Sequence, residues 1–75
     1  MDKLKDIVAY CAANIEDWDI KCGMALSYIG KRMPIPTWFR NEIEGAVSEW
    51  CDYNEVCYDE VDWEEEAEKI VLWAE

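Results

Sequence analysis

Residues 36–55, PTWFRNEIEGAVSEWCDYNE, carry the clearest helical pattern in this chain of 75 residues. Apolar side chains recur at three- and four-residue spacing on one face, and carboxylates fall on the opposite face. The apolar face holds Phe39, Ile43, Ala46, Val47 and Trp50, and the acidic face holds Glu42, Glu44, Glu49, Asp52 and Glu55. Pro36 suits the start of a helix, and the stretch MPIP at residues 33–36 predicts a break before it. Gly45 weakens this helix by about 1 kcal/mol relative to alanine.

Two further helical patterns precede this segment. The first predicts a helix over residues 3–16, from a stripe of Leu4, Ile7, Val8, Cys11, Ile15 and Trp18. The second stripe consists of Cys22, Ala25, Leu26, Ile29 and Met33. Asp17 or Asp19 could cap this second helix, and Gly30 could end it. Residues 22–29 also alternate apolar side chains with period two, so a short strand is the alternative there.

The last helix is predicted to begin at Asp62, after a connector at residues 54–60. Asp62 suits the N-cap, and Glu65 three residues later completes a capping box. The stripe expected to face the core consists of Trp63, Ala67, Ile70, Val71 and Ala74, with Leu72 pointing away and Trp73 at its edge. The sequence therefore predicts a single all-α domain over residues 1–75, a small bundle-like unit of three to four short helices.

The composition favours a packed core in a chain of marginal size. Hydrophobic residues make up 52% of the sequence and include five tryptophans. A domain this small buries only about 60% of the surface that its unfolded chain exposes, and five indoles are hard to enclose in such a core. We therefore expect a folded chain, with homodimerisation as a possible way to cover the surplus apolar surface.

The four cysteines are expected to be buried free thiols. They are Cys11, Cys22, Cys51 and Cys57. The N-terminal stretch MDKLKDIVAY lacks the features of a signal peptide, which favours a reducing, cytoplasmic compartment over disulfide formation. Zinc is the sharper alternative, but the spacing provides no paired CxxC motif and the chain contains no histidine. No metal and no cofactor are predicted.

The charge divides the chain into two halves. Residues 1–40 contain five acidic and six basic residues, a net charge of +1, whereas residues 41–75 contain thirteen acidic residues and one base, Lys69, a net charge of −12. The total of −11 therefore resides almost entirely in the last two predicted helices. Helical carboxylates three or four residues apart lie about 5–6 Å apart at Cβ, a spacing that resembles successive phosphates of a nucleic-acid strand. Such a surface would repel nucleic acid and attract a basic protein that binds it.

No motif in the sequence predicts an enzyme. The absence of histidine excludes Ser-His-Asp and Cys-His catalysis, and the three glycines form no phosphate-binding loop. No apolar run is long enough to span a membrane.

In size, in the concentration of charge in residues 41–75 and in its aromatic-rich helices, the chain resembles small acidic anti-defence proteins of phages and mobile elements. These are the anti-restriction and anti-CRISPR proteins that mimic nucleic acid. The resemblance is one of kind and includes no diagnostic motif. It implies a non-enzymatic, stoichiometric inhibitor that occupies the basic site of a defence nuclease or effector complex. The residues expected to contact the partner are Glu42, Glu49, Asp52, Glu55, Tyr58, Asp59, Glu60, Asp62, Glu64, Glu65, Glu68 and Trp73.

Two other functions remain open at this level. An antitoxin-like or regulatory interaction module would bind a protein through an apolar face, with the charge serving solubility. A divalent-cation buffer would use the carboxylates instead. The aromatic residues Trp63, Trp73 and Tyr58 are candidate anchors for a partner, and core packing is the preferred interpretation for Trp63.

Overall fold

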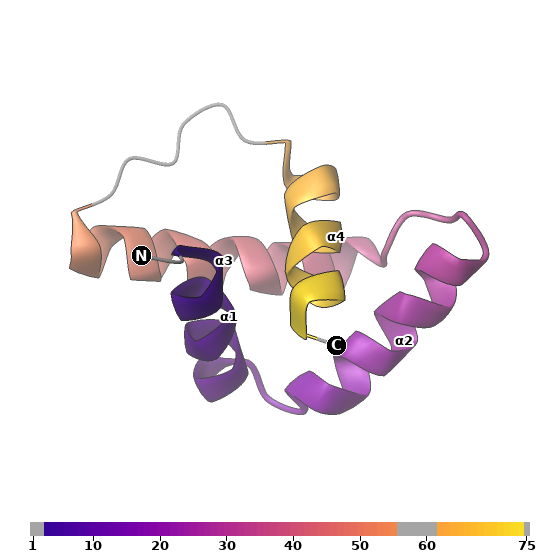
Figure 1. The fold of residues 1–75 in the computed structure, drawn as a ribbon, viewed down its shortest axis with the longest axis horizontal. Coiled ribbons are helices and arrows are strands. Elements are labelled where there is room, and N and C mark those ends of the chain that lie inside the picture. Colours follow the sequence, from indigo (N-terminus) through magenta and orange to yellow (C-terminus); the bar gives the residue numbers. More distant parts are fainter. Residues whose placement is uncertain (1–2, 56–61, 75) are drawn as a thin grey trace.

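A computed structural model describes residues 3–55 and 62–74, apart from the side chains of Lys3 and Glu64 (Figure 1). Within these residues the chain forms four helices and no strand: α1 (Lys3–Asn14), α2 (Trp18–Gly30), α3 (Thr37–Asn54) and α4 (Trp63–Ala74). The all-α prediction is confirmed, and residues 22–29 are helical, so the alternative of a strand there is wrong. The Cα radius of gyration is 11.7 Å, close to the value of about 11 Å expected for a compact domain of this length.

The long helix α3 supports the other elements. Figure 1 shows α1 and α4 crossing α3 at separate points along its length, while α2 lies at the edge of the molecule. Both α1 and α4 contact α3, and α2 packs against α4 and less extensively against α1. The sequence predicted the apolar face of α3. Because both α1 and α4 pack against this face, its apolar residues must extend along most of the helix.

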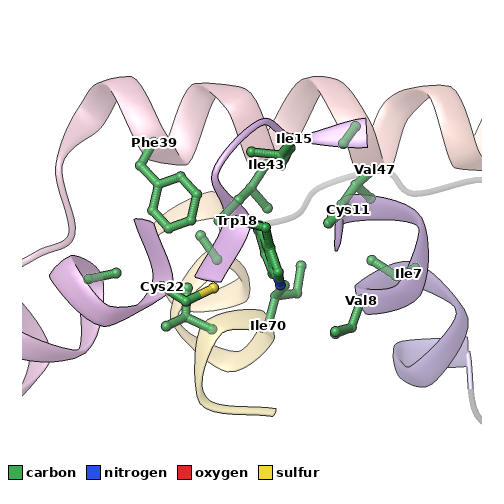
Figure 2. Packing of buried hydrophobic residues seen from close by; sticks show 14 of the residues in the cluster. Ile7, Val8, Cys11, Ile15, Trp18, Cys22, Phe39, Ile43, Val47 and Ile70 are labelled. Atoms are coloured by element: carbon green, nitrogen blue, oxygen red, sulfur yellow. The ribbon is translucent and has the colours of Figure 1, made fainter. Parts of the chain in front are cut away.

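The core brings together residues from every helix. Phe39 and Ile43 of α3, Cys11 of α1 and Ile70 of α4 are completely buried. Trp18, the first residue of α2, lies among them, with its ring centroid 5.7 Å from that of Phe39 (Figure 2). The stripe predicted for the last helix is confirmed, since Ala67, Ile70 and Val71 are buried and Trp63 and Ala74 are partly buried against the core.

The first predicted helix is interrupted earlier than its stripe suggested. It ends at Asn14, whose side-chain amide donates a hydrogen bond of 2.8 Å to the carbonyl of Tyr10. Ile15 and Trp18 are buried as predicted but belong to the turn and to α2. Asp17 occupies the N-cap position of α2 in a left-handed conformation with φ 56°, and its side chain makes no capping hydrogen bond. Asp17 therefore occupies the predicted N-cap position, but it accepts the hydrogen bond from the amide of Lys21, at 2.9 Å, through its backbone carbonyl and not through its side chain. Asp19, the other candidate, lies inside the helix.

Helix α2 ends at Gly30, as the sequence predicted, but Gly30 does not supply the left-handed residue of the turn. Gly30 is the last helical residue, but the left-handed position is taken by Arg32, with φ 59°. The amide of Met33 donates to the carbonyl of Tyr28 and the amide of Arg32 donates to that of Ile29, each at 2.9 Å, which is a Schellman arrangement. This turn leaves Met33 50% exposed, so its predicted place in the buried stripe is wrong.

The break at MPIP is confirmed, and Ile35 between the two prolines is buried. Pro36 occupies the N-cap position of α3, with helical residues beginning at Thr37. At the other end α3 continues to Asn54, the first residue of the predicted connector, and residues 56–60 of that connector lie outside the described residues. Asp62 directly precedes α4, and its carbonyl accepts a hydrogen bond from the amide of Glu66, as expected of an N-cap residue.

Candidate partner-binding surface

The carboxylates of α3 lie on its outer face. Glu42, Glu49, Asp52 and Glu55 are exposed, whereas Phe39, Ile43 and Val47 on the opposite face are fully buried. Glu55 follows Asn54, the last residue of α3, in a left-handed conformation with φ 54°, so the prediction that it lies on the acidic face of this helix is wrong. Because the inner face of α3 is anchored in the core, the fold sets the positions of the other three carboxylates along the helix. Glu44, at the side of the helix, is partly buried.

One of these carboxylates is paired with a base from the near-neutral half of the chain. Lys21 Nζ lies 3.0 Å from Glu42 Oε2. The Lys21 ammonium also lies 5.8 Å from the ring centroid of Trp38. An ion pair at the surface stabilises a protein by at most about 1 kcal/mol. The pairing does compensate the charge of Glu42, so Glu49 and Asp52 carry most of the negative charge on the exposed face of α3.

Glu49 interacts with a tyrosine of α1. The pKa of the Tyr10 hydroxyl is raised by desolvation and by the negative charge of Glu49, with further contributions from Tyr53 and from a hydrogen bond to Glu49. The Tyr10 and Tyr53 ring centroids are 6.4 Å apart. Tyr10 therefore lies close enough to Glu49 for the two groups to interact, while the Glu49 side chain remains exposed.

A shallow acidic groove of about 460 Å³ separates the end of α1 from α3. It is lined by Asn14, Ile15, Glu16, Asn41, Glu42, Gly45, Ala46 and Glu49. The sequence predicted Glu42 and Glu49 as contact residues but missed Glu16, Asn14 and Asn41. Glu16 belongs to the half of the chain with net charge +1, and only the packing of α1 on α3 brings it beside the acids of α3. No local pattern in the sequence could have indicated this neighbour.

The outer surface of α4 has a mixed character. Asp62, Glu65 and Glu68 are exposed as predicted, but Lys69 and Leu72 are exposed among them, with Leu72 at 48%. Four other members of the predicted contact set fall outside what the structure describes: Tyr58, Asp59 and Glu60, and the side chain of Glu64. The more uniform acidic surface in the described residues is therefore that of α3 and the groove beside it.

The candidate aromatic anchors differ in exposure. Trp73 is 44% exposed at the end of α4, which leaves it accessible to a partner. Trp63 is partly buried and packs against the core, in agreement with the preferred interpretation of its role.

The thiols and carboxylates of the described residues form no obvious chemical centre. Cys11, Cys22 and Cys51 are buried thiols, as predicted for them, and Cys57 lies outside the described residues. Burial, with a smaller contribution from Cys22, raises the pKa of the Cys11 thiol to about 12. Within residues 3–55 and 62–74, no three cysteine, aspartate or glutamate side chains are grouped in a way that could hold a metal ion. None of the helices described for this chain combines the length and apolar character needed to cross a bilayer.

Comparison of the chain with protein-family models, with curated proteins and with solved structures finds no match.

Proposed function

We propose that this chain is a non-enzymatic, stoichiometric inhibitor that presents α3 as a mimic of nucleic-acid phosphates to a basic protein. The partner would be a defence nuclease or effector complex, such as a CRISPR-Cas complex, whose nucleic-acid site the acidic helix occupies. The observation that carries the proposal is the exposure of Glu42, Glu49 and Asp52 along a helix whose opposite face is buried in the core, with exposed Glu55 directly after its last residue. Fixed charges bind a complementary surface without the ordering cost of a flexible acidic tail.

The groove beside α3 adds detail to this proposal. Glu16 and Glu49 lie on the same depression, where Asn14 and Asn41 supply further oxygen acceptors. An arginine or lysine side chain of the partner could enter it, because guanidinium and ammonium groups bind carboxylates and amide oxygens. On α4, Glu65 and Glu68 would extend the contact.

The experiment is a capture of partners by the immobilised chain from cells that express defence nucleases, read by mass spectrometry. A captured partner is then titrated at increasing salt and in competition with its own nucleic acid. Binding by mimicry should weaken steeply with salt, and nucleic acid should compete with the chain. Partner binding that ignored salt and tolerated bound nucleic acid would refute the proposal.

Matched charge reversals locate the binding surface. The double variant Glu49→Lys and Asp52→Lys should abolish capture of the partner. The control variant Asp6→Lys and Asp19→Lys changes the net charge equally, at exposed positions in the near-neutral half, and should retain most of the binding. Equal losses in the two variants would indicate a general charge effect and not a specific acidic surface.

A second function is favoured by one specific observation. Leu72 and Trp73 are adjacent, 48% and 44% exposed, at the end of α4. Exposed apolar side chains of this size are a common feature of protein interfaces. If the chain is instead an interaction module that binds through this apolar site, Leu72→Ser or Trp73→Ser should abolish partner binding, whereas the reversals on α3 should leave it intact.

A further inference from the structure

Helix α2 carries an apolar stripe that residues 3–55 and 62–74 leave exposed. Ile20 is 66% exposed, Met24 43% and Tyr28 36%. Residues spaced by four lie above one another on a helix, so these three side chains form one row. The opposite face of α2 is already used, because Cys22 and Ala25 are buried in the core. Since α2 lies at the edge of the molecule, its outer row is open to a partner (Figure 1).

The charges at the two ends of this row have opposite signs. Exposed Glu16 and Asp17 precede α2, and exposed Lys31 and Arg32 follow it. The arrangement is symmetrical in residue number about Met24. Ile20 and Tyr28 lie four positions from Met24, Asp17 and Lys31 lie seven positions away, and Glu16 and Arg32 lie eight.

We propose that a second copy of this chain covers the row, through antiparallel packing of α2 on α2 about a two-fold axis at Met24. In this register Met24 meets Met24 of the second copy, and Ile20 meets its Tyr28. Asp17 lies beside Lys31 of the second copy, and each such contact occurs twice because the interface is isologous. Antiparallel packing also sets the positive end of each helix dipole beside the negative end of the other.

Charge complementarity selects this occupant and this orientation. Parallel packing would oppose Asp17 to Asp17 and Lys31 to Lys31, which is repulsive at both ends. The proposed surface also lies in residues 1–40, whose net charge is +1 in a chain of net charge −11. Two copies therefore meet where their mutual repulsion is smallest. Gly23 borders the row, and a Cβ placed on it would meet no heavy atom within 4 Å, so a second helix can approach closely there.

The first experiment measures the mass of the full chain by sedimentation equilibrium over a range of concentrations at low salt. The wild-type chain should have twice the monomer mass of 8.8 kDa. Met24→Glu places two carboxylates at the two-fold axis and should raise the dimer dissociation constant by at least about tenfold, or 1.4 kcal/mol. The control Leu72→Glu changes a side chain of similar exposure, 48%, on α4 and should leave the dimer intact. Thermal melting followed by circular dichroism verifies that each variant is folded.

The second experiment tests the register through charge. Asp17→Lys and Lys31→Glu should each weaken self-association, because every homodimer then contains two repulsive contacts. An equimolar mixture of the two variants should recover the dimer, since each altered end meets a complementary end. A wild-type chain that stays monomeric at all concentrations, a Met24→Glu variant that remains dimeric, or a mixture that fails to recover the dimer would each overturn the proposal. Dissociation by Leu72→Glu alone would also overturn it, in favour of an interface on α4. These readouts do not involve the partner of the acidic surface, so the proposed function can fail without affecting them.

Discussion

Replacement of Phe39 by alanine should remove most of the stability of the fold. The Phe39 ring is fully buried in α3. Its centroid lies 5.7 Å from that of Trp18 and 5.8 Å from that of Trp38. The substitution therefore leaves a cavity at the point where α2 meets α3, and it removes two aromatic contacts together.

The magnitude follows from this burial. Truncation of a buried phenylalanine to alanine costs about 3–5 kcal/mol. A domain of 75 residues has a total free energy of unfolding of about 4–11 kcal/mol, at roughly 0.05–0.15 kcal/mol per residue. Phe39→Ala is therefore expected to leave little or no folded protein. Phe39→Leu retains an apolar side chain and loses two ring contacts of about 0.5–1.5 kcal/mol each, so we expect a loss of about 1–3 kcal/mol.

The assay is urea unfolding followed by far-ultraviolet circular dichroism, with all variants at the same protein concentration. Leu72→Ala is the control, because Leu72 is 48% exposed on α4 and an exposed substitution of this kind changes stability by about 0.5 kcal/mol or less. The ranking by stability should be wild type and Leu72→Ala, then Phe39→Leu, then Phe39→Ala. If Phe39→Ala unfolded at the same urea concentration as Leu72→Ala, the arrangement of the core would be wrong.

Three further predictions concern the thiol of Cys11 and two backbone positions. The folded state retains the Cys11 proton up to about pH 12, whereas the unfolded state loses it near the ordinary pKa of 9.0. The contribution of this thiol to the free energy of unfolding should therefore be fully present below pH 9 and be lost above it, by up to about 1.4 kcal/mol per pH unit. In urea titrations at different pH, Cys11→Ala should flatten this slope, and an unchanged slope would contradict the raised pKa of Cys11. Gly45→Ala should raise the free energy of unfolding by about 0.5–1 kcal/mol, and with it the urea midpoint, because an added Cβ meets no heavy atom within 4 Å. A lower urea midpoint would show that the groove is tighter than described. Arg32→Gly should relieve the left-handed φ of 59° and stabilise the dilute chain by up to about 1 kcal/mol, whereas destabilisation in thermal melts would argue against this turn.

The amphipathic patterns of the sequence predicted the helices well because burial is periodic along a helix. Phe39, Ile43 and Val47 were assigned to one face of α3, and all three are fully buried. The errors fall at the turns. The stripe from Leu4 to Trp18 continues through residues that are not helical, because an apolar residue in a turn can reach the same core as one in a helix. Arg32 was missed as the left-handed residue because composition favours glycine there.

The candidate site was predicted less completely than the helices. The acids of α3 could be assigned to an outer face from their spacing, and Glu42, Glu49 and Asp52 are exposed there, whereas Glu44 is partly buried. Three features of the site depend on contacts between helices. They are the pairing of Glu42 with Lys21, twenty-one residues away, the proximity of Tyr10 to Glu49, and the approach of Glu16 to the groove. Local periodicity contains no information about such contacts.

The helical character of most of the chain, the buried side of α3 and the concentration of negative charge in residues 41–75 could all be predicted from the amino-acid sequence. These properties depend on side chains within a few residues of one another, and a helix places such neighbours in fixed relation. The packing of the helices, in contrast, was needed to establish which acids share a groove and which face of α2 stays exposed. Those outcomes depend on the turn at Asp17 and the turn at Arg32, because a turn sets the direction of a whole helix, and small changes in backbone angle there redirect every side chain that follows.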